Sequence, residues 1–187
     1  MDEDQVLVSR FRQGDPAAFD SLFRRHKDGV YSLVYRTVGA DAADDVVQEV
    51  FIQIYKSLRR FRGEASFRTW AYRVTLNACR DFVRRRVRQQ AHTSTDDPDD
   101  LACIPDPSAS AGDPTTLWAR DELEQALRAL PEAERTAVEL HYIQRLSYRE
   151  MAAVLGCPDS TIKARIHSAM ARLRRRLCHL AEEASGS

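Results

Sequence analysis

The sequence predicts an all-α protein with two small helical domains joined by a flexible acidic linker, and the second domain is predicted to be a helix-turn-helix. Apolar residues recur at the three-to-four-residue spacing of helices. No stretch shows the sustained alternation or the Asn-Gly turn that is typical of strands. Residues 89–116 contain six Asp, four Pro and no Lys or Arg, with almost no apolar periodicity. Such a segment cannot bury enough surface to offset the entropy of ordering it, which predicts a linker.

Four parts of the chain are expected from this composition. They are a first domain at 1–88, the linker at 89–116, a second domain at 117–180 and a disordered tail at 181–187. The 28 basic and 28 acidic residues balance only as a total. The first domain has 17 Lys and Arg and 12 Asp and Glu, a net charge of +5, whereas the linker has a net charge of −6. The even total therefore does not exclude a nucleic-acid binder.

The first domain is expected to contain a short helix that ends at Gly14 and three longer helices. Capping residues predict where the longer helices begin: Asp15 before Pro16, then Asp41, then Ser66. The expected bounds are Pro16–Val38, Asp41 to about Arg60 and Ser66 to about Arg88, with Gly39 closing the first of them.

Short sequence motifs also predict where the helices of the second domain begin and end. Asp113-Pro114 is typical of a helix start, and Leu130-Pro131 interrupts the apolar pattern and restarts it. Ser147 and Glu150 have the spacing of a capping box. Gly156 lies in a tight turn, and an arginine-rich helix follows. A short helix, a turn with glycine and a longer basic helix predict a helix-turn-helix.

The last helix has an apolar face and an opposite face of small or polar residues. The apolar face is expected to pack inward and consists of Ile162, Ile166, Ala169, Met170, Leu173 and Leu177. The opposite face consists of Ser160, Ala164, His167, Ser168 and Ala171. Its flanks are Lys163 and Arg174 on one side and Arg165, Arg172 and Arg176 on the other. This layout favours base contacts from the centre and phosphate contacts from the edges of a DNA groove over a solvated basic helix in a bundle.

The helix around residues 46–58 carries one apolar residue outside its stripe. The stripe that we expect to be buried is Val46, Val47, Val50, Phe51, Ile54 and Leu58. Ile52 points almost the opposite way, among Asp45, Gln48, Glu49 and Lys56. By spacing alone, a single exposed apolar residue is more typical of an ordinary surface than of a protein contact.

Residues 61–88 interleave aromatic residues with arginines. Surfaces of this composition bind single-stranded nucleic acid, because bases stack on rings while cations follow the backbone. Asn77 is able to donate and to accept hydrogen bonds at a base edge. Spacing alone leaves this role and a structural role open, and most of the rings are expected in the core.

Enzyme, metal and membrane classes find little support in the sequence. No GxxxxGK[ST], GxSxG or HExxH motif occurs, and we expect no cofactor. The four cysteines form no CxxC pair, and Cys178-His179 is an adjacent pair without further ligands nearby, so no metal site is expected. No apolar run approaches the ~18 residues of a membrane span. The acidic start MDEDQ lacks the apolar core of a secretory signal, and we expect a cytoplasmic location.

The chain resembles a bacterial sigma factor of the extracytoplasmic-function (ECF) type, within the sigma-70 family. Three segments carry the resemblance in order and spacing. They are GDPAAFDSLFRRH, DDVVQEVFIQIYKSLRRFRGEASFRTWAYRVTLNACRD and ALRALPEAERTAVELHYIQRLSYREMAAVLGCPDSTIKARIHSAMARLRRRL. The variable segment between the second and the third corresponds to the predicted linker.

The resemblance implies a role for each domain. The first is similar to region 2, which docks on the β′ clamp helices of RNA polymerase and opens the −10 promoter element. The implied clamp contacts are Asp45, Gln48, Glu49 and Ile52. The implied −10 contacts, where a flipped base is captured, are Phe61, Arg62, Gly63, Glu64, Ala65, Ser66, Phe67, Asn77, Arg80 and Arg84.

The second domain is similar to region 4, which reads the −35 element and contacts the β flap. The implied −35 contacts are Arg149, Ser160, Lys163, Ala164, Arg165, His167 and Ser168. The family also implies an anti-sigma factor as a partner. Since the polymerase catalyses RNA synthesis, the chain is expected to be a specificity subunit and not an enzyme. A stand-alone helix-turn-helix regulator and a pure protein-interaction module are the alternatives.

Overall fold

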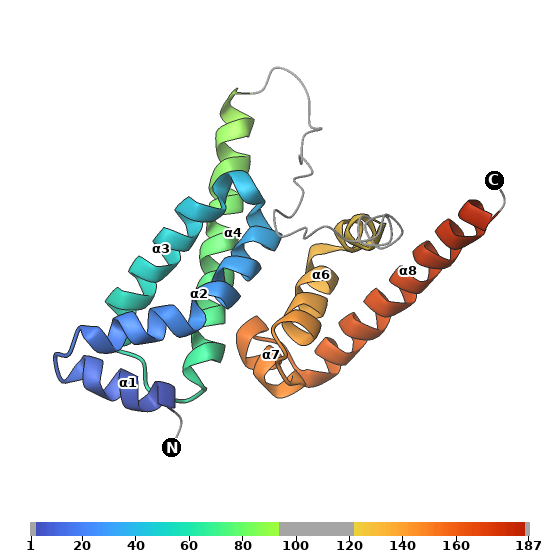
Figure 1. The fold of residues 1–187 in the computed structure, drawn as a ribbon. Coiled ribbons are helices and arrows are strands. Elements are labelled where there is room, and N and C mark those ends of the chain that lie inside the picture. Colours follow the sequence, from blue (N-terminus) through green and yellow to red (C-terminus); the bar gives the residue numbers. More distant parts are fainter. Residues whose placement is uncertain (1–2, 94–121, 186–187) are drawn as a thin grey trace. The chain divides into compact units, whose positions relative to one another are not determined.

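A computed structural model describes residues 3–93 and 122–185 (Figure 1). These residues form helices and connecting turns without strands, which confirms the all-α fold class. The chain divides into two compact units, and each is described by itself. Most of the predicted linker and the predicted helix start at Asp113-Pro114 lie outside the described residues.

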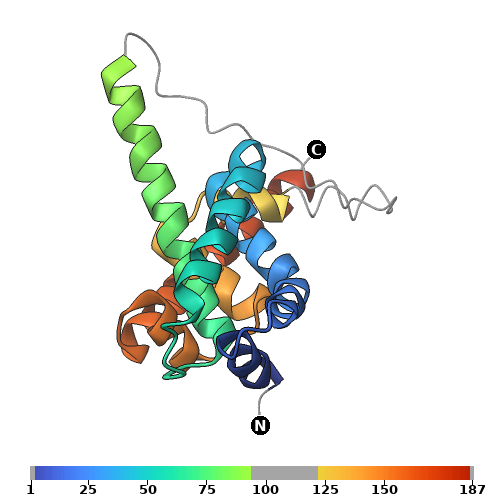
Figure 2. The same cartoon turned by 90° about the vertical axis from the view of Figure 1, so that its left-hand side faces the viewer.

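The first unit is a bundle of four helices. Their bounds are α1 Glu3–Arg12, α2 Ala17–Val38, α3 Ala40–Leu58 and α4 Phe67–Thr93. α2 packs against the other three helices, and α3 also packs against α4. The centre of the bundle is aliphatic and includes Leu22, Val30, Leu33, Val34, Val46, Val50, Ile54 and Leu58. The second half of α4 extends beyond the ends of the other helices of this unit (Figure 2).

Two of the three predicted caps in this unit are present. The Asp15 carboxylate accepts a hydrogen bond from the Ala17 backbone N–H at 3.0 Å, and the Ser66 hydroxyl accepts one from Thr69 N–H at 3.1 Å. The prediction for Asp41 is wrong, because α3 begins at Ala40 directly after Gly39. Gly39 has φ +85°, so it turns the chain without a side-chain cap.

Two helices are longer than predicted. α4 continues to Thr93, five residues into the predicted linker, and α8 continues to Ser185, into the predicted tail. Both extensions contain Ala, Gln or Glu, which are good helix formers, and neither contains Gly or Pro. The helices therefore continue past the point where the apolar pattern ends.

The second unit contains a helical segment at 122–128 and four elements after it. These are α6 Glu132–Val138, the π-helical turn η1 Glu139–Ile143, α7 Tyr148–Leu155 and α8 Asp159–Ser185. Pro131 restarts the helix as predicted. The sequence did not predict η1, which Gln144 stabilises by donating to the Glu139 carboxylate at 3.1 Å. Arg145 follows at φ +54° and redirects the chain into α7.

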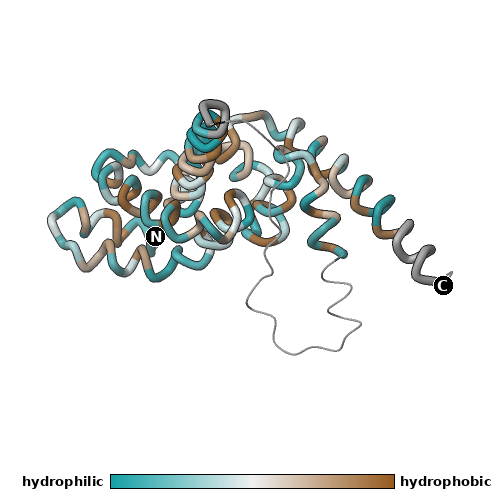
Figure 3. Tube along the Cα trace, turned by 90° about the horizontal axis from the view of Figure 1, so that it is seen from above, coloured by the Kyte–Doolittle hydropathy of each residue, from teal (hydrophilic) through white to brown (hydrophobic). Residues whose placement is uncertain are grey.

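The helix-turn-helix is formed by α7, a turn at Gly156 and α8. Ser147 and Glu150 form the predicted capping box at the start of α7. Gly156 ends α7 in the left-handed conformation at φ +66°. Along α8, apolar and polar positions alternate with the helical repeat (Figure 3). Ile162, Ile166 and other apolar residues of α8 pack on α6 and α7 around the buried Met151.

Candidate nucleic-acid and protein contact surfaces

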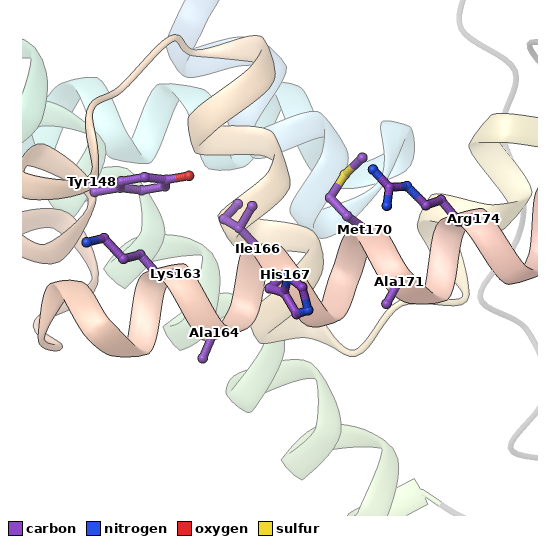
Figure 4. A pocket seen from close by; sticks show the side chains of 8 residues that line it. All are labelled: Tyr148, Lys163, Ala164, Ile166, His167, Met170, Ala171 and Arg174. Carbon is purple, nitrogen blue, oxygen red and sulfur yellow. The ribbon is translucent and has the colours of Figure 1, made fainter.

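The outer face of α8 carries an open hollow of about 590 Å³. It is lined by Tyr148, Lys163, Ala164, Ile166, His167, Met170, Ala171 and Arg174 (Figure 4). Ala164 and Ala171 point to one side of α8, whereas Met170 and Arg174 point to the other. Lys163, Ala164 and His167 are exposed, so this face offers cations and an imidazole around small side chains. That combination suits insertion into a DNA groove.

The predicted faces of α8 are largely those of the structure, with one correction. Ile162, Ile166, Ala169 and Leu173 are buried, and Met170 and Leu177 are half-buried. Ser168 does not belong to the open face, because it is half-buried and its hydroxyl donates to the Glu134 carboxylate at 2.8 Å.

Sequence reasoning missed Glu134, Tyr148 and the exposed part of Met170. Tyr148 lines the hollow from the first turn of α7 and stacks on His141, with ring centroids 5.0 Å apart. No helical wheel of α8 includes residues of α6 or α7, so the wheel offered no signal for Glu134 or Tyr148.

Three further residues of the implied −35 set lie around the turn. Arg149 and Ser160 are exposed. Arg165 is half-buried, and its Nη1 lies 3.7 Å from the Cys157 sulfur in the turn before α8. Arg165 therefore lies on the flank of the open face of α8, as its spacing predicts.

The loop before α4 differs from expectation in its two phenylalanines. Phe61 is 6% exposed and Phe67 is 2% exposed, so neither ring is available for stacking with a base in this conformation. Both rings pack on Trp70, with centroid distances of 4.9 and 5.7 Å. They support the loop from inside the bundle. Its exposed residues are Arg62, Gly63 and Glu64, while Ala65 and Ser66 are half-buried.

Polar and basic residues continue along α4. Asn77 is exposed, and its Oδ1 accepts a hydrogen bond from Arg80 Nη1 at 3.4 Å. Arg84 is exposed one turn further along, 3.8 Å from the carboxylate of Asp81. Asn77 thus lies at the surface beside Arg80, and its amide N–H₂ is able to donate to a base.

A second hollow, of about 580 Å³, lies between α2 and α3. Its lining is aromatic and aliphatic with a few polar groups: Phe19, Asp20, Phe23, Asp44, Val47, Gln48, Phe51, Ile52, Tyr55 and Lys56. Ile52 is 45% exposed and therefore not a core residue. Nor is it an isolated apolar residue, since exposed aromatic rings share the same hollow. Val47 and Phe51, predicted as buried, are only half-buried because they form its floor.

The four implied clamp residues do not all face this hollow. Gln48 and Ile52 line it, and Asp45 is exposed on the same helix. Glu49 turns toward α4, where its carboxylate pairs with Arg85 Nη2 at 2.9 Å. This hydrogen bond with Glu49 raises the pKa of Arg85.

The titratable groups offer little for catalysis. Burial raises the pKa of the Cys79 thiol to about 12, so this thiol is not a nucleophile at neutral pH. Among residues 3–93 and 122–185, no three His, Cys, Asp or Glu side chains are grouped as a metal site requires. None of the helices in these ranges combines the length and apolarity of a bilayer crossing.

Family models cover both units of the chain. Residues 22–89 match sigma-70 region 2, and residues 120–173 match sigma-70 region 4. The ECF RNA polymerase sigma-E factor of Escherichia coli K12 is 37% identical over 174 residues, which cover 89% of this chain and 90% of that protein. The chain belongs to the ECF sigma factors of the sigma-70 family.

Further relatives agree with this membership. The RNA polymerase sigma-H factor of Pseudomonas aeruginosa is 35% identical over 98% of both chains. CnrH, solved in complex with the cytosolic domain of CnrY, has 26% identity and a TM-score of 0.70 over 95% of this chain and 99% of its own. RpoE of Bartonella quintana, at 22% identity and a TM-score of 0.71 over 85% of this chain and 96% of its own, shares the fold.

As a sigma factor, the chain directs RNA polymerase to promoters and is not itself an enzyme. RNA polymerase core is its expected partner. The comparisons give no support to the alternative of a stand-alone regulator.

Proposed function

We propose that the second unit reads the −35 promoter element through the outer face of α8. The observation that carries this proposal is the exposed row of Lys163, Ala164 and His167 beside Arg174 on a helix-turn-helix. Lys163 and His167 contact base edges, and Arg149 and Arg165 contact phosphates on the flanks. Ser160 lies at the end of α8 that enters the groove first.

The first unit opens the −10 element with the loop at 62–66 and the exposed side of α4. Extruding a base from a duplex costs a few kcal/mol, and a site that binds the flipped base offsets that cost. Asn77 supplies the hydrogen bonds, and Arg62, Arg80 and Arg84 hold the single strand. Phe61 and Phe67 do not contact the DNA, but they hold the conformation of the loop by packing inside the bundle.

The hollow between α2 and α3 is the docking site for the polymerase clamp. It unites exposed apolar side chains with Gln48 and, nearby, Asp45, which suits a partner helix with mixed polarity. Ile52 is the apolar contact at its edge. Since CnrH is solved with CnrY, we extend the proposal to an anti-sigma factor that competes with the polymerase for this sigma factor.

The proposed domain roles follow the two family matches. Residues 1–88 serve polymerase binding and −10 opening, and residues 117–180 serve −35 recognition, with 89–116 as their tether. RNA polymerase is a cytoplasmic enzyme in bacteria, so the chain works in the cytoplasm.

Site-specific photo-crosslinking tests these assignments together. Promoters are first isolated by selecting, from a random duplex pool, the sequences that the reconstituted holoenzyme retains. A photoreactive residue is then placed at position 64, 77 or 167. We expect position 167 to crosslink near −35, and positions 64 and 77 to crosslink the non-template strand near −10. Crosslinks of position 167 to the −10 region, or of positions 64 and 77 only to protein, would overturn the assignments.

A further inference from the structure

One carboxylate of α6 holds two side chains of α8. Oε1 of Glu134 accepts a hydrogen bond from the Ser168 hydroxyl at 2.8 Å, and Oε2 lies 3.2 Å from Nε of Arg172. Ser168 and Arg172 are four residues apart, so they occupy adjacent turns on one side of α8. Glu134 thus joins the first turn of α6 to the flank of the DNA-facing helix.

The setting makes this contact stronger than an ordinary surface ion pair. The Glu134 side chain is only 12% exposed, whereas Arg172 is 51% exposed. Water therefore screens the carboxylate poorly, which strengthens its attraction for Arg172, although Oε2 accepts no hydrogen bond from that side chain. The hydrogen bond from Ser168 to Oε1 has a charged acceptor and is stronger than a neutral one. Glu134 also lies in the first turn of α6, where the helix dipole favours a negative charge.

Arg172 consequently differs from the other cations of the α8 face. Lys163 and Arg174 line the open hollow and Arg165 and Arg176 belong to the other flank, and none of these four has an ion pair within the part of the chain that the structure describes. On the other flank, Glu134 compensates the charge of Arg172 and turns the Ser168 hydroxyl toward α6. A compensated cation releases no counterion from DNA, because its charge is already balanced.

We propose that Glu134 is a positioning residue that withholds Ser168 and Arg172 from DNA and so lowers the affinity of α8 for DNA of any sequence. The inference rests on the proposed function, that α8 binds the −35 element. In this arrangement Glu134 lowers non-specific affinity, because Arg172 otherwise adds one contact that every DNA sequence offers. Glu134 therefore acts on the overall affinity for DNA and not on the choice of base.

The test measures how holoenzyme binding depends on salt, on the selected promoter and on the same DNA with a scrambled −35 element. Glu134→Gln keeps a hydrogen-bond acceptor for Ser168 but removes the charge that holds Arg172. We expect several-fold tighter binding to both DNAs at low salt, and a slope of log K against log salt that is steeper by about 0.9, the value of one phosphate contact. The ratio of specific to scrambled binding stays unchanged, because a phosphate contact is made with either DNA.

The matched control is Glu132→Gln, which removes an exposed charge from the same turn of α6. Glu132→Gln is expected to leave the salt slope unchanged. If the two variants changed the slope equally, the effect of Glu134→Gln would come from the net charge of the domain and not from the release of Arg172. Arg172→Gln alone should also leave the slope unchanged, and in the Glu134→Gln background it should restore the wild-type slope.

Two results overturn the inference. If Arg172→Gln alone flattens the slope, or if Glu134→Gln weakens promoter binding while helicity stays normal, Glu134 orients Arg172 for a contact instead of withholding it. If the proposed function itself were wrong, Lys163→Ala and His167→Ala would leave −35 discrimination intact, which distinguishes that outcome from a failure of this inference alone. If those two variants lose discrimination while Glu134→Gln changes nothing, only the role of Glu134 is refuted.

Discussion

At the scale of single residues, the partner of each side chain decides what that side chain is free to contact. Glu49 pairs with Arg85 at 2.9 Å, so its carboxylate already has a partner on α4. Ile52, in contrast, is exposed beside aromatic rings. The two residues are three apart on one helix and have different expected roles, so their substitutions should differ in effect.

Replacing Ile52 with Asp should weaken binding to polymerase core at least tenfold, about 1.4 kcal/mol. The substitution places an unpaired charge in a contact that loses its water on docking. Binding is measured by competition for labelled core, with Val87→Asp as a control because Val87 is also exposed and apolar. A large loss of thermal stability in Ile52→Asp, or an equal loss of core binding in the control, would contradict the assignment.

Replacing Lys163 or His167 with Ala should each cost roughly 1–3 kcal/mol on the selected promoter and little on DNA with a scrambled −35 element. Arg165→Ala should weaken both DNAs alike and reduce the salt slope by about 0.9. Titration of holoenzyme on the two DNAs checks this difference. Equal losses on both DNAs for all three variants would mean that none of these residues reads a base.

The pH dependence of stability should depend on His26 in α2. Burial lowers the pKa of His26, and the charges of Arg25 and Arg68 lower it further. The carboxylate of Asp4 on α1, 2.8 Å from the ring, opposes this shift. The folded state therefore binds fewer protons than the unfolded state just below the unfolded pKa of 6.5. The stability that neutral His26 contributes is complete above that pH and is lost as the pH falls below it.

We expect the wild type to lose more free energy of unfolding than His26→Gln between about pH 7 and about pH 5. Urea unfolding followed by tryptophan fluorescence measures both proteins. A wild type that gains stability relative to the variant on acidification would mean that the attraction of Asp4 outweighs burial.

Residue spacing predicted the direction in which side chains point but not the helix that they meet. The wheel of α8 correctly separated Ile162 from Lys163, because that separation depends only on helical geometry. It misplaced Ser168, because the carboxylate that captures it belongs to α6, more than thirty residues away in the sequence. Phe61 and Phe67 were named as −10 contacts by the resemblance alone, and their burial could not be predicted because it depends on contacts across the bundle.

At the scale of elements, helix boundaries that a cap or a glycine marks could be predicted, with the exception of Asp41, whereas unmarked ends could not. Asp15, Ser66 and Ser147 cap through side-chain hydrogen bonds that a sequence motif specifies. α4 and α8 continue beyond their expected ends, because nothing local stops a helix of good helix formers. The turn η1 depends on the hydrogen bond between the side chains of Gln144 and Glu139, which no sequence motif predicts.

The loop at 62–66 and α4 should act as one element in strand opening. Asn77→Ala and Arg62→Ala are expected to leave core binding intact and to reduce permanganate reactivity of thymines near −10 several-fold. A pre-melted promoter bubble should partly restore transcription, because the unstacking cost is removed. A defect that persists on the bubble, together with reduced helicity, would instead indicate misfolding.

At the scale of the whole molecule, the order of the sequence motifs alone indicates the family, without any information on contacts between side chains. The matches to region 2 and region 4 fall on the two units, and each unit contributes its own contact surface. Side-chain partners such as Glu134 and Glu49 were beyond the reach of that resemblance, because they depend on this chain's own packing.

The most direct test of the central claim, that this chain gives RNA polymerase its promoter specificity, is a map of transcription start sites. Core polymerase transcribes a pool of random linear templates with and without the chain, and the 5′ ends of the RNAs are sequenced. We predict that the chain adds a set of starts preceded by two shared motifs near −10 and −35 at constant spacing, and that Lys163→Ala alters only the upstream motif. Identical starts with and without the chain, or added starts that share no motif, would contradict the account.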